Sequence, residues 1–230
     1  KASSPTADRG LNLAGLPAQE DPWPGLAARP AQIPGLGRWQ IETAAVRSQA
    51  RALQFTPDGK RLVVADGCRI RVYEVPSFKL QRVLLGHPGL IMCLAINPAG
   101  NLVAAGTAYW SPEVRVWDLA TGIQKATTQK TTQFDHSIFG LAWSPDGTQL
   151  AVCAKIWNQT PRGSLHLLDA QLAKREVLDT DLDLQRMCWS PDGKWIAAVK
   201  PVGEKSEVHL WEPDGKAGPV LPVDGTVECI

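Results

Sequence analysis

Trp143-Ser144-Pro145-Asp146-Gly147 is one of four similar segments, and its repetition decides the fold of the chain. The other three are Phe55-Thr56-Pro57-Asp58-Gly59, Ile96-Asn97-Pro98-Ala99-Gly100 and Trp189-Ser190-Pro191-Asp192-Gly193. The final glycines of the four segments are separated by 41, 47 and 46 residues. A period of about 45 residues is typical of a repeated four-stranded β unit. We therefore predict a tandem array of such units.

The chemistry of the repeated segment is that of a hairpin corner. Proline presets φ, the Asp carboxylate accepts hydrogen bonds from its own turn, and Gly supplies the positive φ that reverses the strand. Alternating large residues such as Leu141 and Trp143 precede the corner, with small residues such as Ala142 between them. This pattern predicts a first strand that is buried on both faces. Apolar second strands follow each corner at residues 62–65, 102–105, 150–153 and 195–198.

Third strands are expected where two apolar residues flank a polar one and an acid follows. The segments are Ile70–Glu74, Val114–Asp118, Leu165–Asp169 and Val208–Glu212. Fourth strands are weaker, with 81–85 and 219–223 the clearest. The predicted fold class is all-β, a β-propeller of four-stranded antiparallel blades.

The second unit also carries Gly86-His87 ahead of its first strand and Trp117-Asp118 at the end of its third. At these places the chain resembles the WD-repeat (WD-40 type) β-propeller family. The resemblance covers about residues 45 to 230, but only the second unit shows both dipeptides. It implies a buried network of His, a Ser or Thr, Trp and Asp, and Ala105 stands at the Ser/Thr place. The fourth unit is also similar to the propeller repeats of translocation proteins and oligopeptidases.

The chain is expected to hold only part of a propeller, about four blades of the seven that the resemblance implies. We expect an Ala/Pro/Gly-rich linker at 1–36 and an outer closing strand contributed by the N terminus at 37–44. Blades are expected at 45–87, 88–133, 134–178 and 179–223. Residues 224–230 are expected to start a truncated fifth blade, so the remaining blades of the parent chain are expected partners.

Composition excludes several classes of function. The 24 basic and 23 acidic residues leave a formal net charge of +1, which argues against nucleic acid as a partner. The longest apolar stretch, around residues 90–96, is too short for membrane insertion. The five cysteines form no CxxC pair, so buried free thiols are expected rather than a metal site or a disulfide framework. Glycine-rich phosphate loops are absent, and no cofactor is predicted.

The four histidines do not point to catalysis. His166 and His209 share a repeat column with Arg71 and Arg115, so a polar edge of the third strand explains them. His136 follows Asp135 but has no nucleophile tied to it by a local signature. We therefore predict no catalytic and no metal-binding residues and no enzyme within this chain.

Loops that differ between the units are the candidate binding site. The first unit joins its second and third strands by the tight turn Asp66-Gly67, whereas the second and third units insert residues 107–112 and 155–163. In propellers these loops share one rim with the loops entering each blade. The candidate partner-binding rim consists of Tyr109, Trp110, Asp135, His136, Trp157 and Arg162. Aromatic and Arg side chains in exposed loops dominate binding hot spots, although the two Trp side chains could instead cover blade edges.

The predicted function is a non-catalytic protein-protein interaction scaffold that binds a protein or peptide on this rim. One alternative is a propeller that gates or accompanies an enzyme whose catalytic domain lies outside this chain. Another is a propeller that binds a small ligand in its central channel. The sequence leaves the partner, the compartment and the oligomeric state open.

Overall fold

The computed structural model describes residues 50–108, 112–128, 137–155, 163–173, 175–180, 184 and 186–227. All of them belong to one compact unit, Val46–Ile230. The predicted linker at 1–36 and closing strand at 37–44 lie outside the described residues. No helix in the described part of the chain has the length and apolar character that a membrane crossing demands.

The described residues form four antiparallel sheets of four strands each, which we call blades 1 to 4. Blade 1 contains β1 (Ala50–Phe55), β2 (Arg61–Asp66), β3 (Arg69–Glu74) and β4 (Leu80–Leu84). Blade 2 contains β5 (Ile91–Ile96), β6 (Leu102–Thr107), β7 (Val114–Asp118) and β8 (Gln124–Thr127). Blade 3 contains β9 (Ser137–Trp143), β10 (Gln149–Lys155), β11 (Gly163–Asp169) and β12 (Arg175–Thr180). Blade 4 contains β13 (Arg186–Trp189), β14 (Ile196–Val202), β15 (Lys205–Trp211) and β16 (Ala217–Val223). The predicted all-β class of four-stranded antiparallel blades is confirmed.

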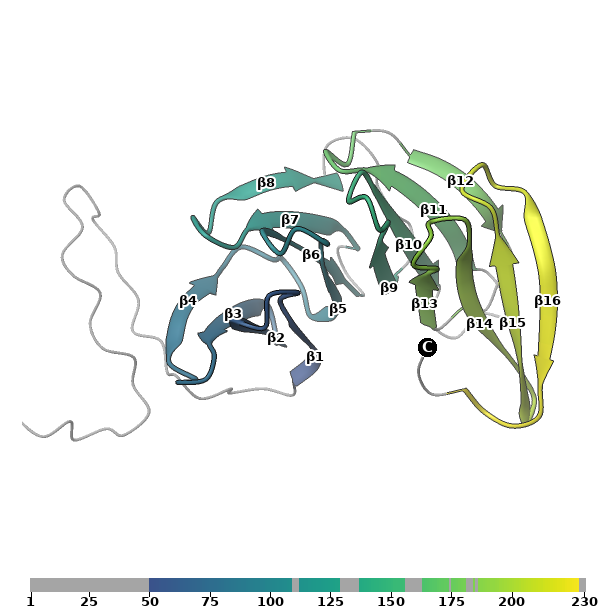
Figure 1. The fold of residues 1–230 in the computed structure, drawn as a ribbon, viewed down its shortest axis with the longest axis horizontal. Coiled ribbons are helices and arrows are strands. Elements are labelled where there is room, and N and C mark those ends of the chain that lie inside the picture. The colour runs from purple at the N-terminus through teal and green to yellow at the C-terminus, as the bar shows by residue number, and fades with distance from the viewer. Residues whose placement is uncertain are drawn as a thin grey trace, which may run out of the picture. The chain divides into compact units, whose positions relative to one another are not determined.

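Successive blades lie side by side in chain order, as Figure 1 shows. The first strands are neighbours: β5 contacts β1 and β9, and β9 contacts β13. The fourth strands lie on the outside of the row. Each blade is a meander, so its first-to-second and third-to-fourth turns lie at the same end. Backbone hydrogen bonds join these two turns, for example from Leu119 N to Asn101 O (2.8 Å) and from Ala170 N to Thr148 O (3.1 Å).

The hydrophobic core lies between the blades rather than at one centre. One buried cluster joins blades 1 and 2, a second joins blades 2 and 3, and a third joins blades 3 and 4. Residues of β5 and β9 are accordingly buried on both faces, as predicted for first strands. The prediction is wrong for β1, where Leu53 and Phe55 are 62% and 50% exposed. Among the described residues β5 covers only one face of β1, so these side chains remain open to solvent.

The four corners lie on a common rim and contact each other in series. A Cβ atom on Gly100 would lie 3.2 Å from Pro57 Cδ, and a Cβ atom on Gly147 would lie 3.6 Å from Pro98 Cδ. For Gly193 the corresponding distance, to Pro145 Cδ, is 3.8 Å. All three glycines have φ near +70°. Glycine thus serves both the turn and the approach of the preceding proline.

Candidate functional site

The six residues of the predicted partner-binding rim lie outside the described residues; they are Tyr109, Trp110, Asp135, His136, Trp157 and Arg162. The structure does describe strand ends that carry such loops. Ile91 N donates a hydrogen bond to Gly67 O (2.9 Å), and Ala108 N donates to Leu90 O (3.1 Å). At blades 1 and 2 the second-to-third connection therefore contacts the chain as it enters blade 2.

Two residues in the polar column of the third strands, Arg71 and His166, are buried, which corrects the expectation of a polar edge for them, whereas Arg115 and His209 are partly exposed. Arg71 is fully buried, and its Nε donates to Asp66 Oδ2 at 2.8 Å. His166 is 4% exposed, and its Nε2 lies 2.5 Å from Ser164 Oγ. A buried polar side chain needs a hydrogen-bonding partner, and Arg71 and His166 each have one within their own blade. These contacts give the two residues a structural role.

His87 lies in a buried polar cluster at the start of blade 2. Its ring packs against Trp117 with centroids 4.8 Å apart, and its Nδ1 lies 3.8 Å from Glu113 Oε1, too far for a hydrogen bond. Glu113 instead accepts a hydrogen bond from Arg115 Nε. Burial, aided by the Arg115 charge, lowers the pKa of His87 to about 3. Ala105, which is paired with Arg115, offers no hydroxyl to the implied network, and an ion pair between Arg115 and Glu113 lies beside the neutral histidine.

Of the four cysteines that the structure describes, two agree with the expectation of buried thiols, Cys188 is half-buried and Cys68 is exposed. Cys93 and Cys153 are buried, with Sγ atoms 3.7 Å from Ile138 O and 3.3 Å from Leu184 O. Burial raises the pKa of the Cys93 thiol. Cys68 is exposed, because it lies in the tight turn between β2 and β3. Among the residues that the structure describes, no three His, Cys, Asp or Glu side chains lie where they could share a metal ion.

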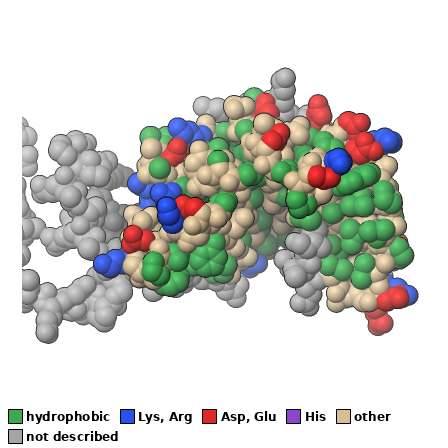
Figure 2. Space-filling view, viewed as in Figure 1, with side chains coloured by type: hydrophobic (Ala, Val, Ile, Leu, Met, Phe, Trp, Pro, Cys, Tyr) green, Lys and Arg blue, Asp and Glu red, His purple; other side chains and the backbone are tan. Residues whose placement is uncertain are grey.

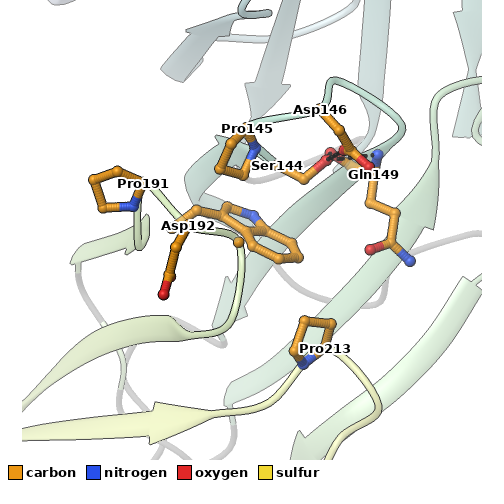
Figure 3. Close-up of a pocket in the computed structure, with 9 residues that line it drawn as sticks. Ser144, Pro145, Asp146, Gln149, Pro191, Asp192 and Pro213 are labelled. Carbon is orange, nitrogen blue, oxygen red and sulfur yellow. Dashed lines mark hydrogen bonds between the residues drawn. The ribbon is translucent and has the colours of Figure 1, made fainter.

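A hollow between the corners of blades 3 and 4, which we call the corner pocket, is the candidate site within the described residues. It has a volume of about 230 Å³. Figure 3 shows Pro145 and Pro191 on one side of the hollow and Pro213, from the β15–β16 turn, across from them. The lining residues are Ser144, Pro145, Asp146, Gln149, Trp189, Pro191, Asp192, Gly193 and Pro213.

The corner pocket lies where two apolar side chains of blade 2 have different counterparts, Gln149 in blade 3 and Pro213 in blade 4. Between blades 2 and 3, Leu102 and Leu172 pack in the buried cluster that contains Trp143. Gln149 stands at the repeat position of Leu102, two residues after the corner glycine. In the β15–β16 turn Pro213 takes the place of Leu119, which is buried with Ile96 between blades 1 and 2.

The missing apolar side chains leave an indole partly uncovered. Trp189 is half-buried, whereas Trp143 and Ile96 at the equivalent positions are 7% and 6% exposed. Trp189 Nε1 donates to Ala142 O at 3.0 Å, which holds the ring against blade 3. The indole is therefore a fixed wall of the corner pocket.

Both acidic groups of the corner pocket are anionic at neutral pH. The Ser144 hydroxyl donates to Asp146 Oδ1 at 2.5 Å, and this bond is the main reason that the pKa of Asp146 is lowered. The Ser190 hydroxyl likewise lowers the pKa of Asp192, to about 2. Lys194 Nζ lies 3.2 Å from Asp192 Oδ2, with both side chains more than half exposed. The lining residues themselves include no cationic group.

Sequence reasoning predicted each corner as a hairpin turn and did not predict a hollow between two of them. One sequence feature that points to the hollow is the polar Gln149, because the same repeat position in the second blade holds Leu102. A second signal was the Pro213-Asp214-Gly215 turn in place of a leucine-containing one. Both become informative only once the two corners are known to be neighbours.

Comparison with known proteins agrees with the repeat pattern. The family model described as WD domain, G-beta repeat, matches residues 78–118 and 127–160. Coronin-7 of Bos taurus is 40% identical over 118 residues, which are 46% of this chain and 12% of the relative. The intraflagellar transport protein 122 homolog of Danio rerio is 26% identical over 186 residues, 74% of this chain and 14% of the relative. The chain thus spans a small part of the length of these relatives.

A solved structure shares the fold. A chain of the Kuenenia stuttgartiensis hydrazine synthase superposes with a TM-score of 0.64 at 19% sequence identity. The match covers 80% of this chain and 57% of that one. With four antiparallel blades, the repeat matches over residues 78–118 and 127–160 and the Gly-His and Trp-Asp dipeptides of blade 2, the chain contains WD repeats and is similar to WD-repeat β-propellers.

Proposed function

We propose that this chain is a non-catalytic part of a larger protein and acts as a protein-protein interaction scaffold. The observation that carries the proposal is a uniform set of blades with connections of unequal length. Only residues 67–68 separate β2 from β3, whereas residues 108–113 separate β6 from β7 and residues 156–162 separate β10 from β11. Loops that vary on a rigid scaffold are where binding residues concentrate.

The proposed partner surface is the rim predicted from sequence, with Trp110 and Trp157 as its aromatic anchors. Tyr109, Asp135, His136 and Arg162 would surround them. Large aromatic side chains bury much area at low cost in conformational entropy, so they suit a protein or peptide ligand. We also propose that the blades extend over 45–87, 88–133, 134–178 and 179–223, with residues 1–36 a linker and 37–44 a closing strand.

The test replaces Trp110 and Trp157 with photo-crosslinking benzoylphenylalanine in the full-length protein and identifies the proteins that become attached. Phe78, which is 57% exposed in the β3–β4 turn at the other end of its blade, is the control position. We expect the same protein partner at positions 110 and 157 and not at 78. The double substitution of both Trp by Ala should weaken capture without lowering the melting temperature. Intact capture with a large loss of stability would assign both side chains to packing and overturn the proposed rim.

A further inference from the structure

We infer that the corner pocket binds a basic side chain, arginine or lysine, presented by an extended segment of a protein partner. The inference rests on the proposed role in protein binding, but it concerns the end of the blades opposite to the proposed rim. It assigns a ligand class to a hollow lined by Gln149 and Pro213, whose counterparts in blade 2 are Leu102 and Leu119.

The negative charge of the lining residues favours a positively charged ligand. Asp146 and Asp192 come from different blades and are the only ionisable groups among the lining residues. Carboxylates accept hydrogen bonds and cannot donate them, so a guanidinium or an ammonium group complements both. The amide of Gln149 adds a further acceptor. Phosphate groups and acidic peptides would be repelled.

The apolar walls select the shape of the occupant. Trp189, Pro145, Pro191 and Pro213 present rings to the hollow. The methylene stem of Arg or Lys packs on such surfaces while its charged end stays near carboxylates and water. A cation over a Trp face gains a further attraction. The volume of about 230 Å³ is below the roughly 300–1,000 Å³ of small-molecule sites, which favours one side chain of a larger partner.

Lys194 already pairs with one of the two carboxylates of the corner pocket. Its ammonium group lies 3.2 Å from Asp192 Oδ2, with exposed fractions of 74% and 53% for the two side chains. Ion pairs as exposed as this one are weak and exchange readily. A partner cation would therefore displace Lys194 from Asp192 at little cost, and Lys194 would compete with it.

The probe is a fluorescein-labelled Gly-Pro-Arg-Pro-Gly peptide, whose binding to the full chain is followed by fluorescence anisotropy. The same peptide with citrulline in place of Arg keeps the shape and removes the charge. We expect the citrulline peptide to bind about tenfold more weakly, which corresponds to about 1.4 kcal/mol. Equal binding of the two peptides would show that the proline and indole surfaces suffice, and it would overturn the inference.

Matched variants locate the site. Asp146→Asn with Asp192→Asn should weaken binding of the Arg peptide about tenfold, because Asn retains the turn acceptors but not the charge. Asp58→Asn is the control, since Asp58 accepts the same hydrogen bonds from Thr56 and Lys60 in blade 1. Lys194→Ala should strengthen binding by removing the competitor, a gain that misfolding could not produce. An equal loss from Asp58→Asn, or no gain from Lys194→Ala, would contradict the inference.

The two proposals fail separately. If crosslinks at positions 110 and 157 persist while the Arg peptide does not bind, the corner pocket is not a basic-residue site and the scaffold function stands. If the Arg peptide binds in the expected order of variants and the crosslinks are absent, the proposed rim is wrong and the corner pocket stands.

Discussion

The corner glycines adopt a positive φ, and some of them also leave room for the proline of the preceding corner. Gly59 and Gly100 have φ of +69° and +71°, which a side chain disfavours by about 1–2 kcal/mol. Around Gly59 no atom lies within 4 Å of a built Cβ, whereas Gly100 meets Pro57 Cδ at 3.2 Å. The two positions therefore separate backbone strain from contact between corners.

We expect Gly59→Ala to destabilise the chain by about 1–2 kcal/mol and Gly100→Ala by more. The additional loss of stability in Gly100→Ala measures the contact with Pro57, which belongs to the preceding blade. Urea denaturation of the two variants and the parent chain measures the difference. Equal losses would mean that the corners do not support one another.

His87 makes stability depend on pH. Its pKa is lowered from 6.5 to about 3 by burial, so between these values the unfolded chain binds a proton that the folded chain does not. Stability is therefore lost as pH falls through this window, with a limiting slope of about 1.4 kcal/mol per pH unit. Thermal denaturation from neutral to acidic pH should show this slope. In His87→Gln the slope should be smaller over the same range, and an unchanged slope would assign it to other groups.

At the scale of elements, indole groups tie the first strands of neighbouring blades together. Trp143 Nε1 in β9 donates to Ala95 O in β5 at 3.1 Å, and Trp189 Nε1 in β13 repeats the bond to Ala142 O in β9. A strand already paired in its own blade gains a second attachment in this way. The bond sets the register of one blade against the next.

Trp143→Phe should destabilise the chain by about 1–3 kcal/mol, because it leaves a buried carbonyl without its donor. Trp189→Phe should cost less, since Trp189 is half-buried and water can replace the lost bond. Melting temperatures of both variants give the order. If Trp189→Phe were the more damaging change, burial would not be what makes this bond important.

Regular bulges are a further feature of the elements that the repeat did not predict. The first strands of blades 1, 2 and 3 each carry an extra residue at the same repeat position, namely Arg51, Met92 and Phe139. Bulges increase local twist. The alternation of large and small residues predicted which residues share a face near the corner, but not where the pairing shifts.

At the scale of the whole molecule, apolar side chains remain exposed on blades 1 and 4. Leu53 and Phe55 are 62% and 50% exposed on β1, and Val220 and Leu221 are 46% and 49% exposed on β16. Figure 2 shows hydrophobic side chains gathered over β16. Such patches favour association with other apolar surfaces.

Leu53→Gln with Phe55→Gln should reduce self-association of the chain without lowering its melting temperature, because neither side chain is buried in it. Light scattering at increasing concentration measures the effect. Phe78→Gln is the matched control, since Phe78 is 57% exposed but lies in a turn. If Phe78→Gln reduced self-association equally, the polarity of the surface in general, and not the β1 face, would govern association.

The repeat by itself determined the four blades, the corners and the buried faces of β5 and β9, because these follow from turn chemistry and alternation within about 45 consecutive residues. Tertiary structure alone decided that Arg71 is buried beside Asp66 and that Glu113 pairs with Arg115 next to His87. It also decided that Asp146 and Asp192 border one hollow. These outcomes depend on which side chains of neighbouring strands and blades come into contact, and the contacts between neighbouring corners join residues more than forty positions apart.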